Sequence, residues 1–221
     1  MRALDPAGAP RRGERGTARL PEVPRLSVFP RPVSAGHDDR ALRFRHSGVR
    51  FFDLDLPDVV ADKARRLRAL DTDTTGVVLT PVDFATDDVA DVLAGAGHDA
   101  RQPTLFIGEH LVLFLRPDAV QRLLTGVSGR AAKGSTLGLT VEVHPAGLDS
   151  ALVVPTVDEV MFGGAGPLHT IKDRGAWLTL FEQHGRRVEG AAEPTAVDHF
   201  ELPMTGRRVQ IQTQFLTATT G

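Results

Sequence analysis

Residues 33–63 constrain the fold more than any other stretch, because they join a small-residue turn to a strand that ends in acids. The turn is formed by residues 34–36, and an apolar run at residues 49–52 leads directly into Asp53 and Asp55. In open α/β sheets, ligands bind at the carboxyl ends of strands, where an acid can accept hydrogen bonds from ribose hydroxyls. This stretch therefore indicates a nucleotide-type ligand.

The composition of the chain excludes several kinds of partner and of catalytic site. The 221 residues are enough for one sizeable α/β domain, and the formal charge of -2 gives no global field for nucleic acid or an anionic membrane surface. The sequence has no cysteine and no tyrosine, which excludes thiolate metal sites, a cysteine nucleophile and tyrosine acid–base chemistry. No apolar run approaches the roughly 20 residues that span a bilayer. These features predict a cytoplasmic protein without nucleic-acid or membrane partners.

The domain organisation follows from a change in composition. Residues 1–32 are rich in Arg, Pro, Gly and Ala and predict a disordered or irregular leader, whereas residues 33–221 predict a single domain. A first strand is hinted at inside the leader by Leu26, Val28 and Phe29. Prolines follow it directly, and proline cannot donate a hydrogen bond to a central sheet ladder.

Strands and helices alternate after the turn. Strands are predicted at residues 49–54, 77–82 and 135–144, and residues 104–115 predict a buried central strand passing into a loop or short helix. Helices are predicted at residues 41–44, 59–70, 87–94, 118–127 and 172–184. A closing hairpin pairs residues 200–202 with 207–216 around Gly206. This order favours a three-layer α/β sandwich.

Acidic side chains follow several of these strands. Asp53 and Asp55 lie two residues apart on a strand and so share a face; one could accept from ribose hydroxyls, and capping of the helix after Pro57 is the competing interpretation. Asp83 ends the next strand and could accept from an adenine amino group or simply terminate the strand. Glu109 interrupts an apolar run, so it needs either an arginine or a ligand as its partner.

Four segments in order carry a resemblance to a known family. They resemble motifs of the leucine carboxyl methyltransferase-like family of class I S-adenosylmethionine-dependent O-methyltransferases, which includes polyketide O-methyltransferases. The segments are residues 34–40 (SAGHDDR), 53–57 (DLDLP) with Lys63, 81–84 (PVDF), and 103–109 (PTLFIGE) with the pair 114–115. The chain departs from the family pattern at Ser34 and His110, where the family has glycine, and in its shorter N-terminal region.

The resemblance implies a Rossmann-like class I methyltransferase fold, with a mostly parallel sheet, helices on both faces and a C-terminal antiparallel hairpin. It also implies S-adenosyl-L-methionine as cofactor. Gly36 would allow close backbone approach, Asp38 and Arg40 would orient the turn, and Glu109 would meet the ammonium group. The cofactor-binding residues expected from the resemblance are Gly36, Asp38, Arg40, Asp53, Asp55, Asp83, Phe84 and Glu109.

Some patterns argue against other chemistries. The eight histidines form no HExxH and no close pair, so no metal site is expected, and His110 is either a base or a wall residue of the pocket. Residues 95–101 (GAGHDAR) nearly copy the first motif, but they follow a helix and so predict a helix C-cap leading into the next strand. The absence of a full GxGxxG disfavours a nicotinamide-dependent oxidoreductase.

The expected function is methyl transfer to an oxygen of a small molecule, a carboxylate or a hydroxyl, in secondary metabolism. A carboxylate is already ionised at pH 7 and needs no general base, so its methylation would depend on alignment. Specific residues for the acceptor are not identified. The alternative is a methyltransferase-like protein that binds cofactor or a partner without turnover.

Overall fold

The computed structural model describes Gly36 and residues 38–44, 48–162, 168–191, 195–201 and 208–220. The leader, the first strand hinted at near Leu26, the altered position Ser34 and the turn residue Gly206 lie outside the described residues. None of the helices in the described ranges is long and apolar enough to cross a membrane.

The first part of the chain forms a small parallel unit. Strands β1 (Phe51–Asp55) and β2 (Val77–Pro81) pair in parallel, and helix α2 (Pro57–Ala69) connects them. Pro57 occupies the first turn of α2, where its missing N–H leaves no hydrogen bond unmade. Before this unit lies the short helix α1 (Arg40–Arg43). These elements follow the predicted strands and helices to within a few residues.

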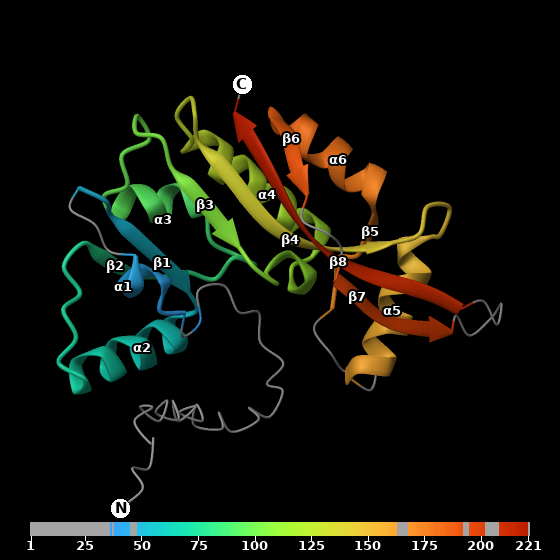
Figure 1. Cartoon of the computed structure of the whole chain (residues 1–221), viewed down its shortest axis with the longest axis horizontal. Coiled ribbons are helices and arrows are strands. Elements are labelled where there is room, and N and C mark those ends of the chain that lie inside the picture. The colour runs from blue at the N-terminus through green and yellow to red at the C-terminus, as the bar shows by residue number, and fades with distance from the viewer. Residues whose placement is uncertain are drawn as a thin grey trace, which may run out of the picture.

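A second, six-stranded sheet is built around two long strands, β4 (Thr136–His144) and β8 (Arg208–Thr220). Strand β4 pairs in parallel with β3 (Leu105–Gly108) and β5 (Lys172–Asp173), and antiparallel with β8. Strands β6 (Arg186–Ala191) and β7 (Thr195–Glu201) pair antiparallel with β8. Figure 1 shows β4 and β8 crossing the centre of the molecule, with β1 and β2 to one side.

Helices cover both faces of this sheet. On one face, α3 (Val89–Gly95), α4 (Pro117–Gly129) and α6 (Arg174–Gln183) pack with β3 and β4 in the larger hydrophobic core. On the other face, α5 (Ser150–Phe162) packs through Val153 and Val157 with Ile211 of β8 and the 3-10 helix η1 (Val112–Phe114). Ile211 and Leu216 of β8 belong to different cores. Successive side chains of a strand point to opposite faces, so residues five positions apart lie on opposite faces of the sheet.

The closing antiparallel pair is confirmed, since β7 and β8 pair from Thr195 with Thr213 to Glu201 with Arg208. Three expectations need correction or addition. The residues predicted as a buried central strand form β3, but Leu105 and Ile107 are exposed because β3 pairs only with β4 among the described strands. Helix α5 and strand β6 were not predicted; Pro155 lies inside α5 and obscures its helical pattern.

Parallel pairing places the carboxyl ends of neighbouring strands at one edge. The ends of β1 and β2 lie together at Asp55 and Pro81, and those of β3 and β4 lie together beyond Gly108. The acids singled out in the sequence follow three of these four strand ends. This edge is where a ligand site is expected in an open α/β sheet.

Candidate functional site

The glycine turn is attached to the end of β1 by a buried hydrogen bond. The Gly36 amide donates to Asp55 Oδ2 over 2.6 Å, and Asp55 Oδ1 accepts from the Leu56 amide over 2.7 Å. Gly36 has φ +50°, a left-handed conformation that glycine adopts without a Cβ clash. Asp55 is only 2% exposed, so its carboxylate is committed to holding the turn.

Asp53 lies two residues earlier and is held by a lysine. Lys63 of α2 donates to Asp53 Oδ2 over 2.6 Å and to the carbonyl oxygen of Asp38 over 2.7 Å. The Asp53 side chain keeps 17% of its surface exposed and that of Lys63 keeps 8%. Lys63 therefore connects the end of β1 to the segment that follows the glycine turn, and it leaves Asp53 at the surface of the site.

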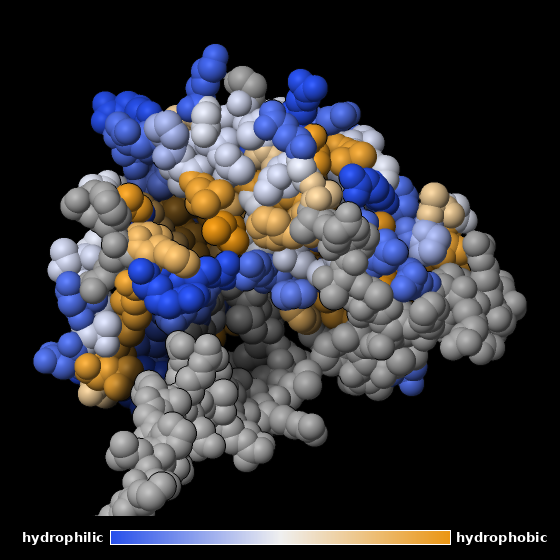
Figure 2. Space-filling model, viewed as in Figure 1, coloured by the Kyte–Doolittle hydropathy of each residue, from blue (hydrophilic) through white to orange (hydrophobic). Residues whose placement is uncertain are grey.

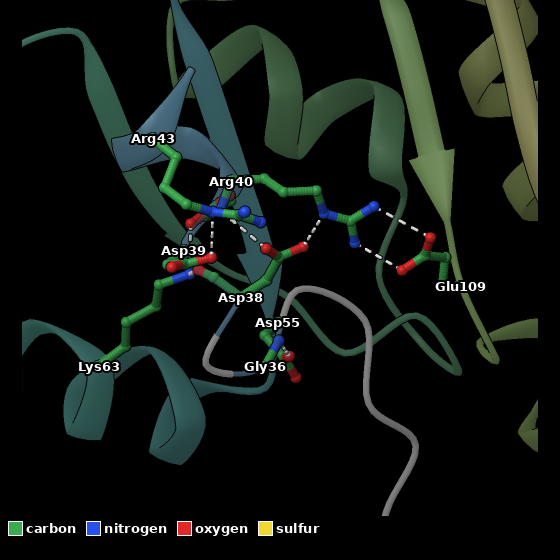
Figure 3. A network of polar contacts seen from close by, with 9 residues as sticks. Gly36, Asp38, Asp39, Arg40, Arg43, Asp55, Lys63 and Glu109 are labelled. Atoms are coloured by element: carbon green, nitrogen blue, oxygen red, sulfur yellow. Dashed lines mark hydrogen bonds and ion pairs between the residues drawn. The ribbon is translucent and has the colours of Figure 1, made fainter. Parts of the chain in front are cut away.

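Arg40 connects the turn segment to the end of β3 (Figure 3). Its guanidinium makes two hydrogen bonds to Glu109, Nη1 to Oε1 over 3.0 Å and Nη2 to Oε2 over 2.5 Å, while Nε bonds Asp38 Oδ2. The Arg40 amide also donates to Asp38 Oδ1 over 2.8 Å. Arg40 thus joins the nearby carboxylate of Asp38 to that of Glu109, which lies 69 positions after Arg40 in the chain.

These contacts shift the ionisation of the groups that make them. The hydrogen bonds that Arg40 donates to Glu109, with a smaller contribution from those to Asp38, raise the pKa of Arg40 against the opposing effect of burial. Burial opposes the ionisation of Asp38, but the backbone and side-chain hydrogen bonds from Arg40 outweigh it and lower the pKa of Asp38. Asp38 and Arg40 are therefore both ionised at neutral pH, as an ion pair.

Asp83 and Phe84 lie at the carboxyl end of β2. Asp83 Oδ1 accepts from the Ala85 amide over 2.9 Å, and the Asp83 amide donates to Asp87 Oδ2 over 2.8 Å. Asp83 thus organises the turn that leads toward α3. Phe84 is half-buried and packs against the larger core.

A cavity of about 740 Å³ opens between β1 and β3. Its lining includes Asp38, Arg40, Asp53, Phe84 and Glu109 from the predicted site. The remaining lining is mainly apolar and comes from β1, β3, β4, α3 and α4. Figure 2 shows apolar side chains gathered in this hollow, with hydrophilic side chains along its rim. The structure therefore brings five of the eight predicted residues to the lining of one cavity. The four charged ones, Asp38, Arg40, Asp53 and Glu109, form its polar rim.

The other three predicted residues support this rim from outside the cavity lining. Gly36 and Asp55 lie beneath it as a hydrogen-bonded pair, and the Asp83 carboxylate accepts from its own turn. Asp53 and Asp55 do end the same strand, as the spacing predicts, but Asp53 lines the cavity and Asp55 is buried.

One pair of charged side chains was not recognised in the sequence. His110 lies in the loop after β3, and Glu142 lies in β4. The His110 Nδ1 atom is 3.4 Å from Glu142 Oε1. The hydrogen-bonding carboxylate of Glu142 raises the pKa of His110, and burial opposes that shift. A sequence signal exists for Glu142, because it is the only acid in the apolar strand β4.

The near-copy of the glycine motif has a different structure. Helix α3 ends at Gly95, its C-cap is Ala96, and Gly97 follows with φ +84°. The His98 amide donates to the Leu93 carbonyl over 2.9 Å, which closes the end of the helix. The prediction of a helix C-cap is confirmed.

Comparison with known proteins finds a family match for the first part of the domain. Residues 33–128 match the family model described as leucine carboxyl methyltransferase. Over these residues, the chain is similar to the leucine carboxyl methyltransferase family. The matched range contains all eight predicted cofactor-binding residues, from the glycine turn to the end of β3.

Two relatives from this comparison carry the name "Putative S-adenosyl-L-methionine-dependent methyltransferase". One, from Frankia alni, is 40% identical over 111 residues, which are 49% of this chain and 38% of the relative. The other, from Parafrankia sp., is 29% identical over 190 residues, 81% of this chain and 59% of the relative. The chain thus spans only part of the length of the curated relatives it matches.

The fold of this chain is the class I methyltransferase fold, as its sequence predicted. The solved structure of the pyocyanin biosynthetic protein PhzM aligns with 90% of this chain and 53% of its own, with a TM-score of 0.52 at 17% identity. At that identity the likeness concerns the fold alone. The cofactor and the reaction are therefore argued from the site and the closer relatives.

Proposed function

We propose that this chain is an S-adenosyl-L-methionine-dependent methyltransferase that methylates an oxygen of a small molecule in secondary metabolism. One observation carries the proposal: the segments that match the family converge on one polar rim, at the carboxyl ends of β1 and β3. The names of the matched relatives support the same cofactor. Bound there, the cofactor would supply an electrophilic methyl group on a sulfonium.

The ribose side of the cofactor is assigned to β1. Asp53 lines the cavity, retains exposed surface and is ionic beside Lys63, so its carboxylate is suited to accept from two hydroxyls. Asp55 lacks that access, and we assign it to holding Gly36 in the turn that faces the ligand. This division sharpens the earlier expectation that either acid could serve the ribose.

The amino-acid end of the cofactor is assigned to Arg40 and Glu109. Each of these residues carries one charge at the rim, and together they are complementary to a group that has one carboxylate and one ammonium. A guanidinium binds a carboxylate in the planar two-bond geometry that Arg40 now makes with Glu109. Ligand binding would therefore exchange one ion pair for two. Asp38 keeps Arg40 in place during that exchange.

The adenine side is assigned to the end of β2. Phe84 lines the cavity and offers an aromatic surface, and Asp83 is its neighbour in the chain. Asp83 Oδ1 already accepts from Ala85, but a carboxylate has the capacity for further hydrogen bonds from an amino group. The assignment to the adenine rests mainly on Phe84.

The chain's own contribution to catalysis would be alignment. Holding two reactants in the correct geometry can lower a barrier by roughly 7–11 kcal/mol, and it requires bound groups that do not move. The interlocked contacts of Asp55, Lys63 and Arg40 provide that rigidity on the cofactor side. Apolar side chains around the rim would exclude water from the transferring methyl group.

Isothermal titration calorimetry with S-adenosylhomocysteine tests this proposal without knowledge of the acceptor. We expect saturable binding at one site per chain, and weaker binding by Asp53→Ala. Asp91→Ala is the matched control, because Asp91 is an exposed acid on α3 away from the rim. Absence of binding to the unmodified chain would refute the proposed function.

A further inference from the structure

The His110 imidazole and the Glu142 carboxylate lie against each other beside the proposed cofactor site. His110 directly follows Glu109 after the end of β3, and Glu142 lies in β4, which pairs with β3 in parallel. The register aligns Gly108 with Leu139, so residues two or three positions further along both strands meet at the same edge. The ring nitrogen Nδ1 and the carboxylate Oε1 are 3.4 Å apart.

The two partners differ in their access to solvent. The side chain of Glu142 is 7% exposed, whereas that of His110 is 63% exposed. Within the described residues, the second carboxylate oxygen of Glu142 is buried and has no hydrogen-bond partner. A buried carboxylate with an unsatisfied oxygen costs several kcal/mol unless a cation compensates it. His110 lies against the other oxygen, Oε1, and becomes a cationic partner of this carboxylate when its ring takes up a proton.

The backbone of His110 is also unusual. His110 has φ +51°, one of two non-glycine residues with positive φ among the described ranges. Side chains rarely adopt this conformation, and such strain is concentrated at functional sites. The strained backbone and the buried carboxylate are independent observations, and both place the His110 imidazole at this edge.

We propose that His110 is the general base for the acceptor and that Glu142 is its positioning residue. This inference rests on the proposed function and deepens it. When Nδ1 faces Glu142, that nitrogen carries the proton, and Nε2 is left as the acceptor on the exposed side of the ring. A carboxylate behind a histidine orients the ring and stabilises its protonated form.

A base at this position defines the class of acceptor. A hydroxyl must lose its proton as its oxygen attacks, whereas a carboxylate has already lost it at pH 7. In this step, the proton of the acceptor O–H passes to His110 Nε2 and the oxygen keeps the electron pair. That pair forms the bond to the methyl carbon as the carbon–sulfur pair returns to sulfur. The products are a methyl ether, S-adenosylhomocysteine and an imidazolium beside Glu142. The acceptor is therefore a hydroxyl compound.

The pH dependence follows from the charges around His110. Glu142 of β4 and Glu109 at the end of β3 both favour the protonated ring, while Arg40 of α1 neutralises Glu109. The base must be neutral to act, so kcat/KM with a hydroxyl acceptor rises with pH until it passes the raised pKa of His110. In Glu142→Gln, this rise moves to lower pH and the maximum rate falls.

Two kinds of measurement test the inference. The first is NMR titration of the His110 ring in the unmodified chain and in Glu142→Gln. We expect a pKa above about 6.5 in the unmodified chain and a lower pKa in the variant. An unchanged titration would overturn the pairing, whatever the activity shows.

The second measurement compares methyl transfer to a panel of simple phenols and benzoates for His110→Asn. Asparagine tolerates positive φ, so this variant keeps the local backbone. We expect methylation of phenols, an about 10²–10⁴-fold loss of kcat in His110→Asn, and unchanged affinity for S-adenosylhomocysteine. His169→Asn, at an exposed histidine elsewhere, is the control that retains full activity.

The outcomes separate the inference from the proposed function. Methylation of benzoates alone, or phenol methylation that His110→Asn leaves intact, would overturn the role of His110 while the methyltransferase assignment stands. Binding of S-adenosylhomocysteine without methylation of either set would overturn both the base and turnover by this chain. Absence of binding would refute the cofactor site itself.

Discussion

The Gly36 amide and the Asp55 carboxylate, 19 positions apart, form a buried hydrogen bond of 2.6 Å. This contact places the glycine turn at the carboxyl end of β1, next to the other contacts of the rim. Lys63 then ties Asp53 to the backbone of Asp38, and Arg40 ties Asp38 to Glu109. The rim is thus held by a series of contacts, and the first of them, the hydrogen bond between Gly36 and Asp55, is buried.

Asp55→Ala is expected to lower the free energy of unfolding by about 1–3 kcal/mol, because it leaves the buried Gly36 amide without an acceptor. It should also weaken binding of S-adenosylhomocysteine, since the turn loses its attachment. Urea denaturation and calorimetry measure the two effects. Asp91→Ala, at an exposed acid, is expected to change neither. Equal stability of the two variants would refute the structural role of Asp55.

Variants of the Arg40–Glu109 pair distinguish its effect on stability from its effect on ligand binding. Arg40→Met is expected to weaken S-adenosylhomocysteine binding by about 10–100-fold, the range that corresponds to a hydrogen bond to a charged group. Exchange of the two charges, in the double variant R40E/E109R, allows the ion pair to form again but reverses its orientation and sets a carboxylate against Asp38. We expect this variant to recover part of the stability and none of the affinity. Recovery of both would show that orientation does not matter to the ligand.

Gly126 and Gly129 of α4 form a matched pair for the packing of α3 on α4. A Cβ on Gly126 would lie 2.5 Å from Val89 Cγ1 and 3.2 Å from the Ala90 backbone nitrogen, whereas one on Gly129 meets nothing within 4 Å. Gly126→Ala is expected to destabilise the protein by about 1–3 kcal/mol through overpacking. Gly129→Ala should be neutral or stabilise it by up to about 1 kcal/mol. Thermal unfolding of the two variants gives the comparison.

The lowered pKa of His98 predicts that the protein loses stability as the pH decreases. Burial lowers its pKa, Arg130 and Arg50 add to that shift, and Asp99 opposes it. Because the folded pKa lies below the unfolded one, the unfolded state binds more protons, so stability falls as pH decreases from about 6.5 toward the folded pKa. Urea denaturation between pH 5 and pH 7.5 should show a smaller loss in His98→Gln than in the unmodified chain. The same slope in both would contradict the burial effect.

Local patterns in the sequence predicted most of the fold. The proline at the start of α2 and the apolar run of β2 are signals within single segments. The exposure of Leu105 and Ile107 in β3 could not be predicted, because burial of a strand depends on its neighbours in the sheet. Helix α5 was hidden by Pro155 and by the glycines and prolines around it.

The same distinction between local signals and contacts made by the fold applies to the residues of the site. The family motifs gave the acids and the glycine turn, because these residues follow strand ends that are visible in the sequence. The partners that connect them were not predictable, since they join positions far apart in the chain. Arg40 meets Glu109 across 69 positions, and His110 meets Glu142 across two strands. Only the folded sheet shows that Asp55 is buried and Asp53 is not.

A crystal structure of the chain with S-adenosylhomocysteine tests the central claim most directly. The account predicts the ligand along the carboxyl ends of β1 and β3, with its ribose hydroxyls on Asp53 and its amino-acid group between Arg40 and Glu109. A ligand bound away from this rim, or one that leaves the Arg40–Glu109 pair intact and does not touch Asp53, would contradict it.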